Sequence, residues 1–137
     1  LLTACGEATV PKITTTLRKR YGGSHIVMGC KQLRSDLNFA WPSSEIAVMG
    51  ASGAVAILCG KEAKAKKEAG EDVKAFLAEK EDEYTEKFAN PYEAASYGYI
   101  DDVIEPRNTR FRICRGLAQL ATKRQQLPAK KHGCMPM

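Results

Sequence analysis

Two segments of this sequence place a glycine turn between a run that favours a strand and a run that favours a helix. In the first, residues 12–17 are rich in β-branched side chains and follow Pro11, which predicts a strand. The pair Gly22-Gly23 then interrupts the chain, and Ser24 is a suitable N-cap for a short helix. A strand, a turn and a helix are therefore expected in this order.

The second segment repeats that order. Residues 45–49 are mostly apolar, which predicts a strand buried on both faces. The turn at 50–53 then opens a helix whose inward residues are expected to be Ala54, Val55, Ile57 and Leu58. This alternation predicts an α/β layered fold, and the length of 137 residues favours one domain.

The remaining elements follow from composition and spacing. Residues 61–72 are rich in Lys, Glu and Ala, which predicts a solvated helix or a surface excursion. From 73 to 88, apolar residues recur at helical spacing, and this stripe predicts core packing rather than a ligand site. A short extended segment is expected at 39–41, a short helix at 92–97 and a last strand at 99–104. The final helix is expected over 107–124, with inward residues Ile113, Cys114, Leu117, Leu120 and Ala121.

The net charge of +5 is concentrated at one end. Residues 107–137 contain eight basic residues and no acidic one, so residues 1–106 carry a net charge of −3. A basic end could bind nucleic acid, an anionic ligand or an acidic neighbouring surface. This stretch has one aromatic residue, Phe111, and therefore lacks the interleaved stacking residues of single-strand binders. A solvated or subunit-facing basic helix is the expectation.

Cysteine and histidine usage disfavours several classes of site. The five cysteines are scattered with no C-x-x-C pair, which disfavours both a disulfide framework and a zinc site and fits a reducing compartment. With only two histidines, no protein-bound metal is expected. His25 is the one plausible base for a nucleophile, but no G-x-S-x-G turn accompanies it. No apolar run is long enough to span a bilayer.

The glycine turns have a possible chemistry of their own. The first turn of a helix leaves backbone N–H groups unpaired and carries partial positive charge, so main-chain donors there can hold an anion or an oxyanion. Glycine also serves such turns through its conformational freedom alone. Neither turn matches a nucleotide-phosphate motif. From the residues alone, an α/β domain with possible oxyanion turns is expected.

A series of short motifs occurs in a fixed order along almost the whole chain. They read ATVPKIT at 8–14, YGG at 21–23, AWP at 40–42, EIAVMGA at 45–51, KFANP at 87–91, GYIDDVIEP at 98–106, TR at 109–110 and KKHG at 130–133. In this order they resemble the C-terminal half of the biotin-dependent acyl-CoA carboxyltransferases. Within this family, the motifs resemble those of the propionyl-CoA carboxylase β chains and methylmalonyl-CoA decarboxylase α chains.

This resemblance implies a crotonase-like fold of repeated β-β-α units. A complete family member has an N-terminal domain that holds the acyl-CoA and a C-terminal domain that receives carboxybiotin from a carrier protein. The active site lies between two subunits, commonly within a hexamer. Residues 1–137 are then expected to be a partial C-terminal domain with a charge-rich helical excursion at about 60–87, cut from a longer protein and lacking the N-terminal domain.

The resemblance also implies roles for the residues of the first turn. Gly23 and Ser24 match the family positions whose backbone amides stabilise negative charge on the biotin ureido oxygen, and Gly22 permits the turn. Ile26 lies near the pocket that senses the acyl group; it could alter substrate preference or only pack against its helix. His25 is not expected to act as a base.

Residues outside the first turn are expected to have supporting roles. Gly50 and Ala51 would shape the same cleft from the neighbouring helix start. Arg107 and Arg110 would contact another subunit or domain rather than the CoA phosphates.

The function implied is carboxyl transfer between carboxybiotin and propionyl-CoA or methylmalonyl-CoA. The chain would belong either to a cytoplasmic carboxylase β subunit or to a decarboxylase α subunit that docks on a membrane partner. The residues 24–26 slightly favour the decarboxylase. Without its CoA-binding half, the chain alone is expected to be inactive. The alternative from another class is a non-catalytic binding or assembly module that uses the basic C-terminal helix.

Overall fold

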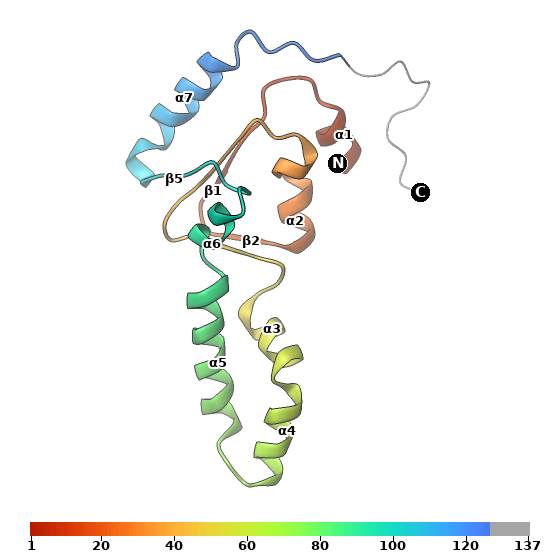
Figure 1. Cartoon of the computed structure of the whole chain (residues 1–137), viewed down its shortest axis with the longest axis vertical. Coiled ribbons are helices and arrows are strands. Elements are labelled where there is room, and N and C mark those ends of the chain that lie inside the picture. The colour runs from red at the N-terminus through yellow and green to blue at the C-terminus, as the bar shows by residue number, and fades with distance from the viewer. Residues whose placement is uncertain (127–137) are drawn as a thin grey trace.

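A computed structural model describes residues 1–126 of the chain (Figure 1). The helices are α1 (Leu2–Glu7), α2 (Gly22–Val27), α3 (Ala51–Leu58), α4 (Gly60–Glu68), α5 (Val73–Phe88), α6 (Pro91–Ser96) and α7 (Thr109–Gln119). The strands are β1 (Ile13–Thr16), β2 (Lys19–Tyr21), β3 (Leu37–Ala40), β4 (Glu45–Ala47) and β5 (Asp102–Val103). Short 3-10 turns cover Lys31–Leu33 and Pro106–Asn108. The predictions for residues 127–137, including the KKHG motif, lie outside the described residues.

The strands form two small parallel sheets. One has the order β1-β3-β5, with Thr14 opposite Asn38, and the other pairs β2 with β4, with Tyr21 opposite Ala47. The chain therefore runs twice through a strand in the first sheet, a strand in the second sheet and a helix: β1-β2-α2 and then β3-β4-α3. This repeated β-β-α order is the α/β architecture expected from the sequence. The separate strand β2 was not expected, nor was α1.

A small apolar cluster lies where the two sheets meet α6. It contains Ala40, Ile46, Ala94 and Ile100, each at most 7% exposed. Polar residues are buried nearby, among them Asn38, which is fully buried. The prediction that 45–49 is buried on both faces is wrong, because Val48 is 77% exposed where the chain leaves the sheet.

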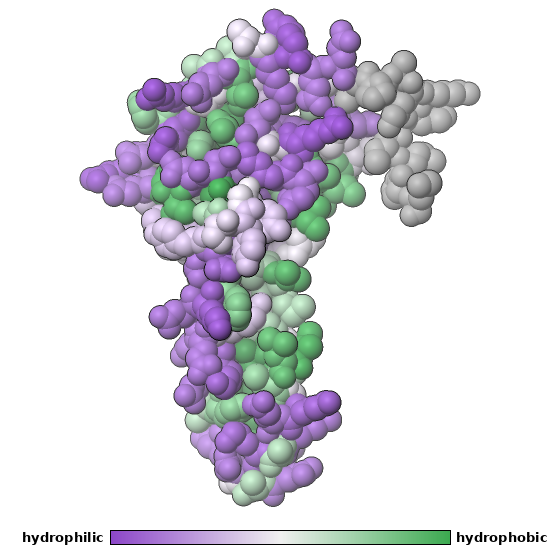
Figure 2. Space-filling view, in the orientation of Figure 1, coloured by the Kyte–Doolittle hydropathy of each residue, from purple (hydrophilic) through white to green (hydrophobic). Residues whose placement is uncertain are grey.

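Helices α3, α4 and α5 form a hairpin that extends away from the sheets (Figure 1). This hairpin contains the predicted charge-rich helical excursion. Figure 2 shows hydrophobic side chains along the α3 side of the hairpin and hydrophilic side chains along the α5 side. Two expectations are wrong here: Ile57 and Leu58 are 71% and 69% exposed, and α5 contains no buried residue. The reason is that α3 packs mainly on α5 and otherwise contacts the adjoining α4, so Ile57 and Leu58 stay uncovered within residues 1–126.

Helix α7 packs on the first sheet through a glycine. A Cβ atom at Gly116 would lie 2.6 Å from Cδ1 of Leu37, so the helix approaches the sheet closely at this point. The inward face predicted for this helix is therefore wrong in part: Leu117 is 47% exposed and Cys114 and Ala121 are also exposed. No helix in residues 1–126 is long and apolar enough to cross a membrane.

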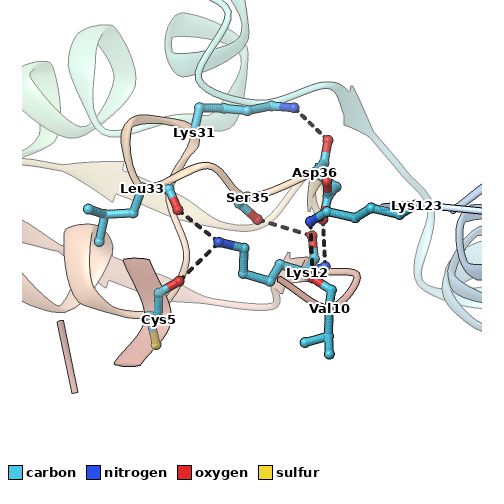
Figure 3. Close-up of polar contacts among 8 residues, drawn as sticks. All are labelled: Cys5, Val10, Lys12, Lys31, Leu33, Ser35, Asp36 and Lys123. Atoms are coloured by element: carbon cyan, nitrogen blue, oxygen red, sulfur yellow. Dashed lines mark hydrogen bonds and ion pairs between the residues drawn. The ribbon is translucent and has the colours of Figure 1, made fainter. Parts of the chain in front are cut away.

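Lys12, Lys31 and Lys123 surround Asp36, and these contacts connect the segment after α7 to the loops that precede β1 and β3 (Figure 3). Lys123 Nζ lies 2.8 Å from Asp36 Oδ2 and donates to the Val10 carbonyl oxygen at 3.0 Å. The Lys12 amide donates to the same carboxylate oxygen at 2.7 Å. Burial by itself raises the pKa of Asp36, but the hydrogen bonds from Lys123 and Lys12 outweigh it and lower the pKa. The carboxylate is therefore a charged anchor between distant parts of the chain.

Candidate functional site

The structure brings the two glycine turns together. Strands β2 and β4 are parallel neighbours, so α2 and α3 begin at the same edge of their sheet. A Cβ atom at Gly22 would lie 2.9 Å from the Val48 carbonyl oxygen, and one at Gly50 would lie 3.6 Å from Cε2 of Tyr21. Two turns that are 28 residues apart in the sequence therefore form one site.

Helix α2 begins three residues earlier than the sequence predicts. Tyr21 is its N-cap in extended conformation, whereas Ser24 lies inside the first turn. The Ser24 hydroxyl donates to the Tyr21 carbonyl oxygen at 2.6 Å instead of accepting a backbone N–H. The expectation that Ser24 caps the helix is therefore wrong. The reason is that the helix already begins at Gly22, whose backbone adopts a conformation that glycine tolerates well. As a result, the amides of Gly23 and Ser24 belong to the first turn, where a helix offers no carbonyl partner.

The two glycines of the first turn have different requirements. Gly22 has a φ of +50° and lies against the Val48 backbone, so a side chain there would be strained and would clash. Gly23 has no atom within 4 Å of the position that a Cβ would occupy, and Gly23 and Ser24 are both exposed. Space therefore exists beside these two amides for another molecule.

A cavity of about 310 Å³ lies between α2, β4, α6 and the end of α5. It is lined by Gly22, His25, Ile26, Gln32, Ile46, Ala47, Val48, Phe88, Glu93, Ala94, Tyr97 and Tyr99. Of the residues singled out from the sequence, Gly22, His25 and Ile26 therefore line the cavity. Gly23, Ser24, Gly50 and Ala51 do not line it and lie at the adjacent helix starts.

Two side chains near the turns have shifted pKa values. Burial, followed by the nearby Arg20 cation, lowers the pKa of His25, and its Nδ1 atom is buried without a hydrogen-bond partner. His25 is therefore neutral at neutral pH and lies in the cavity wall. Burial raises the pKa of Tyr21 to about 12, and a hydrogen bond from its hydroxyl to the Glu45 carboxylate adds to the effect. Tyr21 consequently stays protonated and links the two strands.

Several lining residues could not be found from local patterns. Gln32 comes from a 3-10 turn, and Glu93, Tyr97 and Tyr99 come from α6 and the loop after it. Glu93, Tyr97 and Tyr99 are far in sequence from both glycine turns, and no spacing rule connects any of the four residues to them. Among residues 1–126, no group of three or more His, Cys, Asp or Glu side chains could hold a metal ion.

Comparison with known proteins places this geometry in a family. The sequence profile of the carboxyl transferase domain matches residues 1–135. The propionyl-CoA carboxylase β chain of Saccharopolyspora erythraea is 51% identical over 137 residues, which cover 100% of this chain and 25% of the relative. The methylmalonyl-CoA decarboxylase α subunit of Propionigenium modestum is 50% identical over 137 residues, which cover 100% of this chain and 26% of the relative.

A solved structure agrees with these sequence matches. The transcarboxylase 12S structure, described as a hexamer assembly with methylmalonyl-CoA and methylmalonic acid bound, has a TM-score of 0.87 and 52% identity, and the match covers 99% of this chain and 25% of that one. The chain thus spans about a quarter of the length of the relatives it matches. Its α/β fold is the crotonase-like fold of the carboxyltransferases. The chain therefore belongs to the carboxyl transferase domain family.

Proposed function

We propose that this chain is the biotin-side part of the C-terminal domain of a carboxyltransferase subunit. The complete subunit transfers a carboxyl group between carboxybiotin and a short-chain acyl-CoA, with propionyl-CoA or methylmalonyl-CoA as the substrate pair. The observation that carries this proposal is the similarity along the whole chain, at about half of all positions, to relatives named for those two compounds. The paired helix starts described above agree with it.

The amides of Gly23 and Ser24 are the groups that we assign to charge stabilisation. They lack partners within the helix, and the helix dipole adds partial positive charge at this end. Because Gly23 is exposed and has free space around it, a planar ring can approach these donors, so the residues present fit biotin. When bound, biotin supplies a ureido group that carries the carboxyl and takes up negative charge on its oxygen when the carboxyl leaves. Donors fixed before the reaction stabilise such charge without reorganisation.

The cavity beside these amides is assigned to the acyl group. Ile26 and Val48 give it an apolar wall, which suits a short hydrocarbon chain. Gly22 forms the turn that brings α2 to this wall. Gly50 and Ala51 support the site from the start of α3, because Gly50 packs beside the Tyr21 ring.

The carrier and subunit partners are proposed from the family. An N-terminal carboxyltransferase domain of the same subunit and of a neighbouring one would complete the active site in a homo-oligomer, as the hexamer of the 12S relative suggests. A biotin carrier protein would deliver the carboxyl group. A carboxylase would work in the cytoplasm, whereas a decarboxylase α subunit would also bind a membrane subunit. Neighbouring genes separate the two: a biotin carboxylase gene indicates the first and a polytopic membrane subunit the second.

The test is a hybrid subunit in which these 137 residues replace the matching segment of the transcarboxylase 12S subunit. We expect the hybrid to carry out carboxyl transfer with methylmalonyl-CoA and biotin. Gly23→Val should lower its turnover about 100-fold or more, because the side chain blocks access to the amides. Gly60→Val is the matched control, since Gly60 also has open space around it and lies on the hairpin.

Two results would contradict the proposal. An assembled hybrid without activity would favour the binding-module alternative, which binding to heparin across a salt series would then examine. That alternative has less support, because Arg107 pairs with Glu105 and Arg112 with Asp102. A Gly23→Val hybrid as active as its Gly60→Val counterpart would remove the role assigned to the amides.

A further inference from the structure

Arg20 is a buried cation with no carboxylate partner in the part of the chain that the structure describes. It is the central residue of β2 and only 6% of it is exposed. Among residues 1–126, no carboxylate oxygen lies within 4.0 Å of its guanidinium. Burying such a charge is costly unless hydrogen bonds compensate for the lost water. The hydrogen bonds of Arg20 therefore show which parts of the fold it connects.

The guanidinium joins three elements. Its Nη1 atom donates to Thr16 Oγ1 at 3.2 Å and to Asn38 Oδ1 at 3.3 Å, on β1 and β3 of the first sheet. Its Nη2 atom donates to the His25 carbonyl oxygen at 3.0 Å, in the last turn of α2. Because the Arg20 backbone belongs to the second sheet, one side chain connects both sheets to α2.

Helix α2 needs such an anchor. It has six residues, which is too short to be stable without tertiary contacts. The carbonyl groups in the last turn of a helix lack intrahelical partners, and a cation near them is favourable. Arg20 supplies both the hydrogen bond and the charge at this end of α2.

The helix that Arg20 holds forms one wall of the cavity. Gly22, His25 and Ile26 of α2 line that cavity, and the Arg20 hydrogen bond ends on the carbonyl group of His25 itself. A shift of this carbonyl would move the neighbouring Ile26 and the rest of the helix with it. The planar guanidinium of an arginine donates hydrogen bonds in two fixed directions at once, which the ammonium group of a lysine cannot do.

We propose that Arg20 is a positioning residue that fixes α2, and with it the cavity wall and the first-turn amides, against the two sheets. This proposal rests on the proposed function for its effect on catalysis, but not for its effect on the structure. Arg20 touches no reacting group itself.

The first test measures amide hydrogen exchange in the full chain carrying Arg20→Lys, with Lys19→Met as the control on an exposed residue of the same strand. The amides of Ile26, Val27 and Met28 report on α2, and those of the middle of α5 report on the hairpin. We expect at least about tenfold faster exchange in α2 with no change in α5. Equal acceleration everywhere, or no acceleration in α2, would overturn the proposal.

The second test uses the 12S hybrid with the same two substitutions. We expect Arg20→Lys to lower kcat about 10- to 100-fold with little change in the KM for methylmalonyl-CoA, because misplaced groups slow the reaction more than they weaken binding. An unchanged kcat in an active hybrid would overturn the catalytic part. If the unsubstituted hybrid is inactive, the proposed function fails, and the exchange experiment still decides whether Arg20 fixes α2.

Discussion

The body of the molecule (residues 1–50 and 89–126) and the helical hairpin (residues 51–88) are held together in different ways. In the body, several polar contacts join residues far apart in sequence, such as Lys123 with Asp36 and the Asn38 amide with Asp101. In the hairpin, the side-chain contacts are local: Asp72 caps α5, and Lys80 pairs with Glu83. The polar contacts of the body therefore form only when its distant segments come together, whereas those of the hairpin form between residues close in the sequence.

Burial shows the same difference. In the hairpin, α4 and α5 contain no buried residue, and the buried residues of α3 are Ala54 and Val55. The body buries apolar residues together with a network of polar ones around Arg20 and Asn38. A polar network of this kind requires all of its members at once. Substitutions in the body should consequently cost more than substitutions in the hairpin.

The largest effect is expected from Gly22→Ala in the body. The substitution forces an alanine into a left-handed conformation and against the Val48 carbonyl, at a cost of about 2–4 kcal/mol in the free energy of unfolding. Gly23→Ala is the matched control, because open space surrounds it. Denaturant unfolding of both variants measures the difference. Equal stability of the two would show that the turn does not require glycine at position 22.

The second effect concerns the long-range contact at Asp36. Lys123→Met removes a hydrogen bond to the Val10 carbonyl oxygen and an ion pair to Asp36, whose side chain is 17% exposed. We expect the free energy of unfolding to fall by about 1–3 kcal/mol. Arg110→Met, which changes an exposed cation on α7, is the control. The same unfolding measurement applies. A Lys123→Met variant as stable as the control would mean that the cluster contributes no net stability.

The comparison also explains what the sequence could predict. Helix spacing and charge are local properties, so the sequence predicts a charge-rich helical excursion at about 60–87 and a helix end at Asn90-Pro91. The glycine turns are predictable for the same reason. The prediction that the stripe of α5 packs in a core is wrong, since spacing alone cannot show whether a partner covers a helix face.

In the body, the sequence could not reveal the contacts that complete the site. Arg20 follows Arg18 and Lys19 in the sequence, and only the pleat of β2 turns it inward while Lys19 on the same strand faces solvent. The cavity residues Glu93 and Tyr97 reach α2 through the tertiary fold. The proposed role of Gly23 and Ser24 remains a prediction that the hybrid experiment examines.

A smaller effect is expected from Asp72→Ala in the hairpin. Asp72 accepts hydrogen bonds from the amides of Lys74 at 2.9 Å and Ala75 at 3.2 Å, and the loss of such a cap costs about 1 kcal/mol. Asp82→Ala, on the exposed side of α5, is the control. Because the hairpin is held locally, hydrogen exchange should accelerate in the first turns of α5 while β1 and β3 stay protected. Acceleration in the sheets as well would mean that hairpin and body unfold together.

The smallest effect is a dependence of the body's stability on pH through His25. Its pKa is lowered in the folded state relative to the usual 6.5, first by burial and then by Arg20. Above pH 6.5 both the folded and the unfolded states are neutral at this residue, so its contribution does not change. As the pH falls below 6.5, the unfolded state binds the proton first, and stability decreases until the folded-state pKa is passed.

His25→Gln should therefore flatten the decrease between pH 7.5 and 5, as measured by urea unfolding at each pH. The hairpin contains no histidine, so exchange in the middle of α5 serves as an internal reference after correction for the intrinsic rate. Identical pH slopes for the two proteins would mean that burial and the Arg20 cation do not lower the pKa of His25 in the folded state.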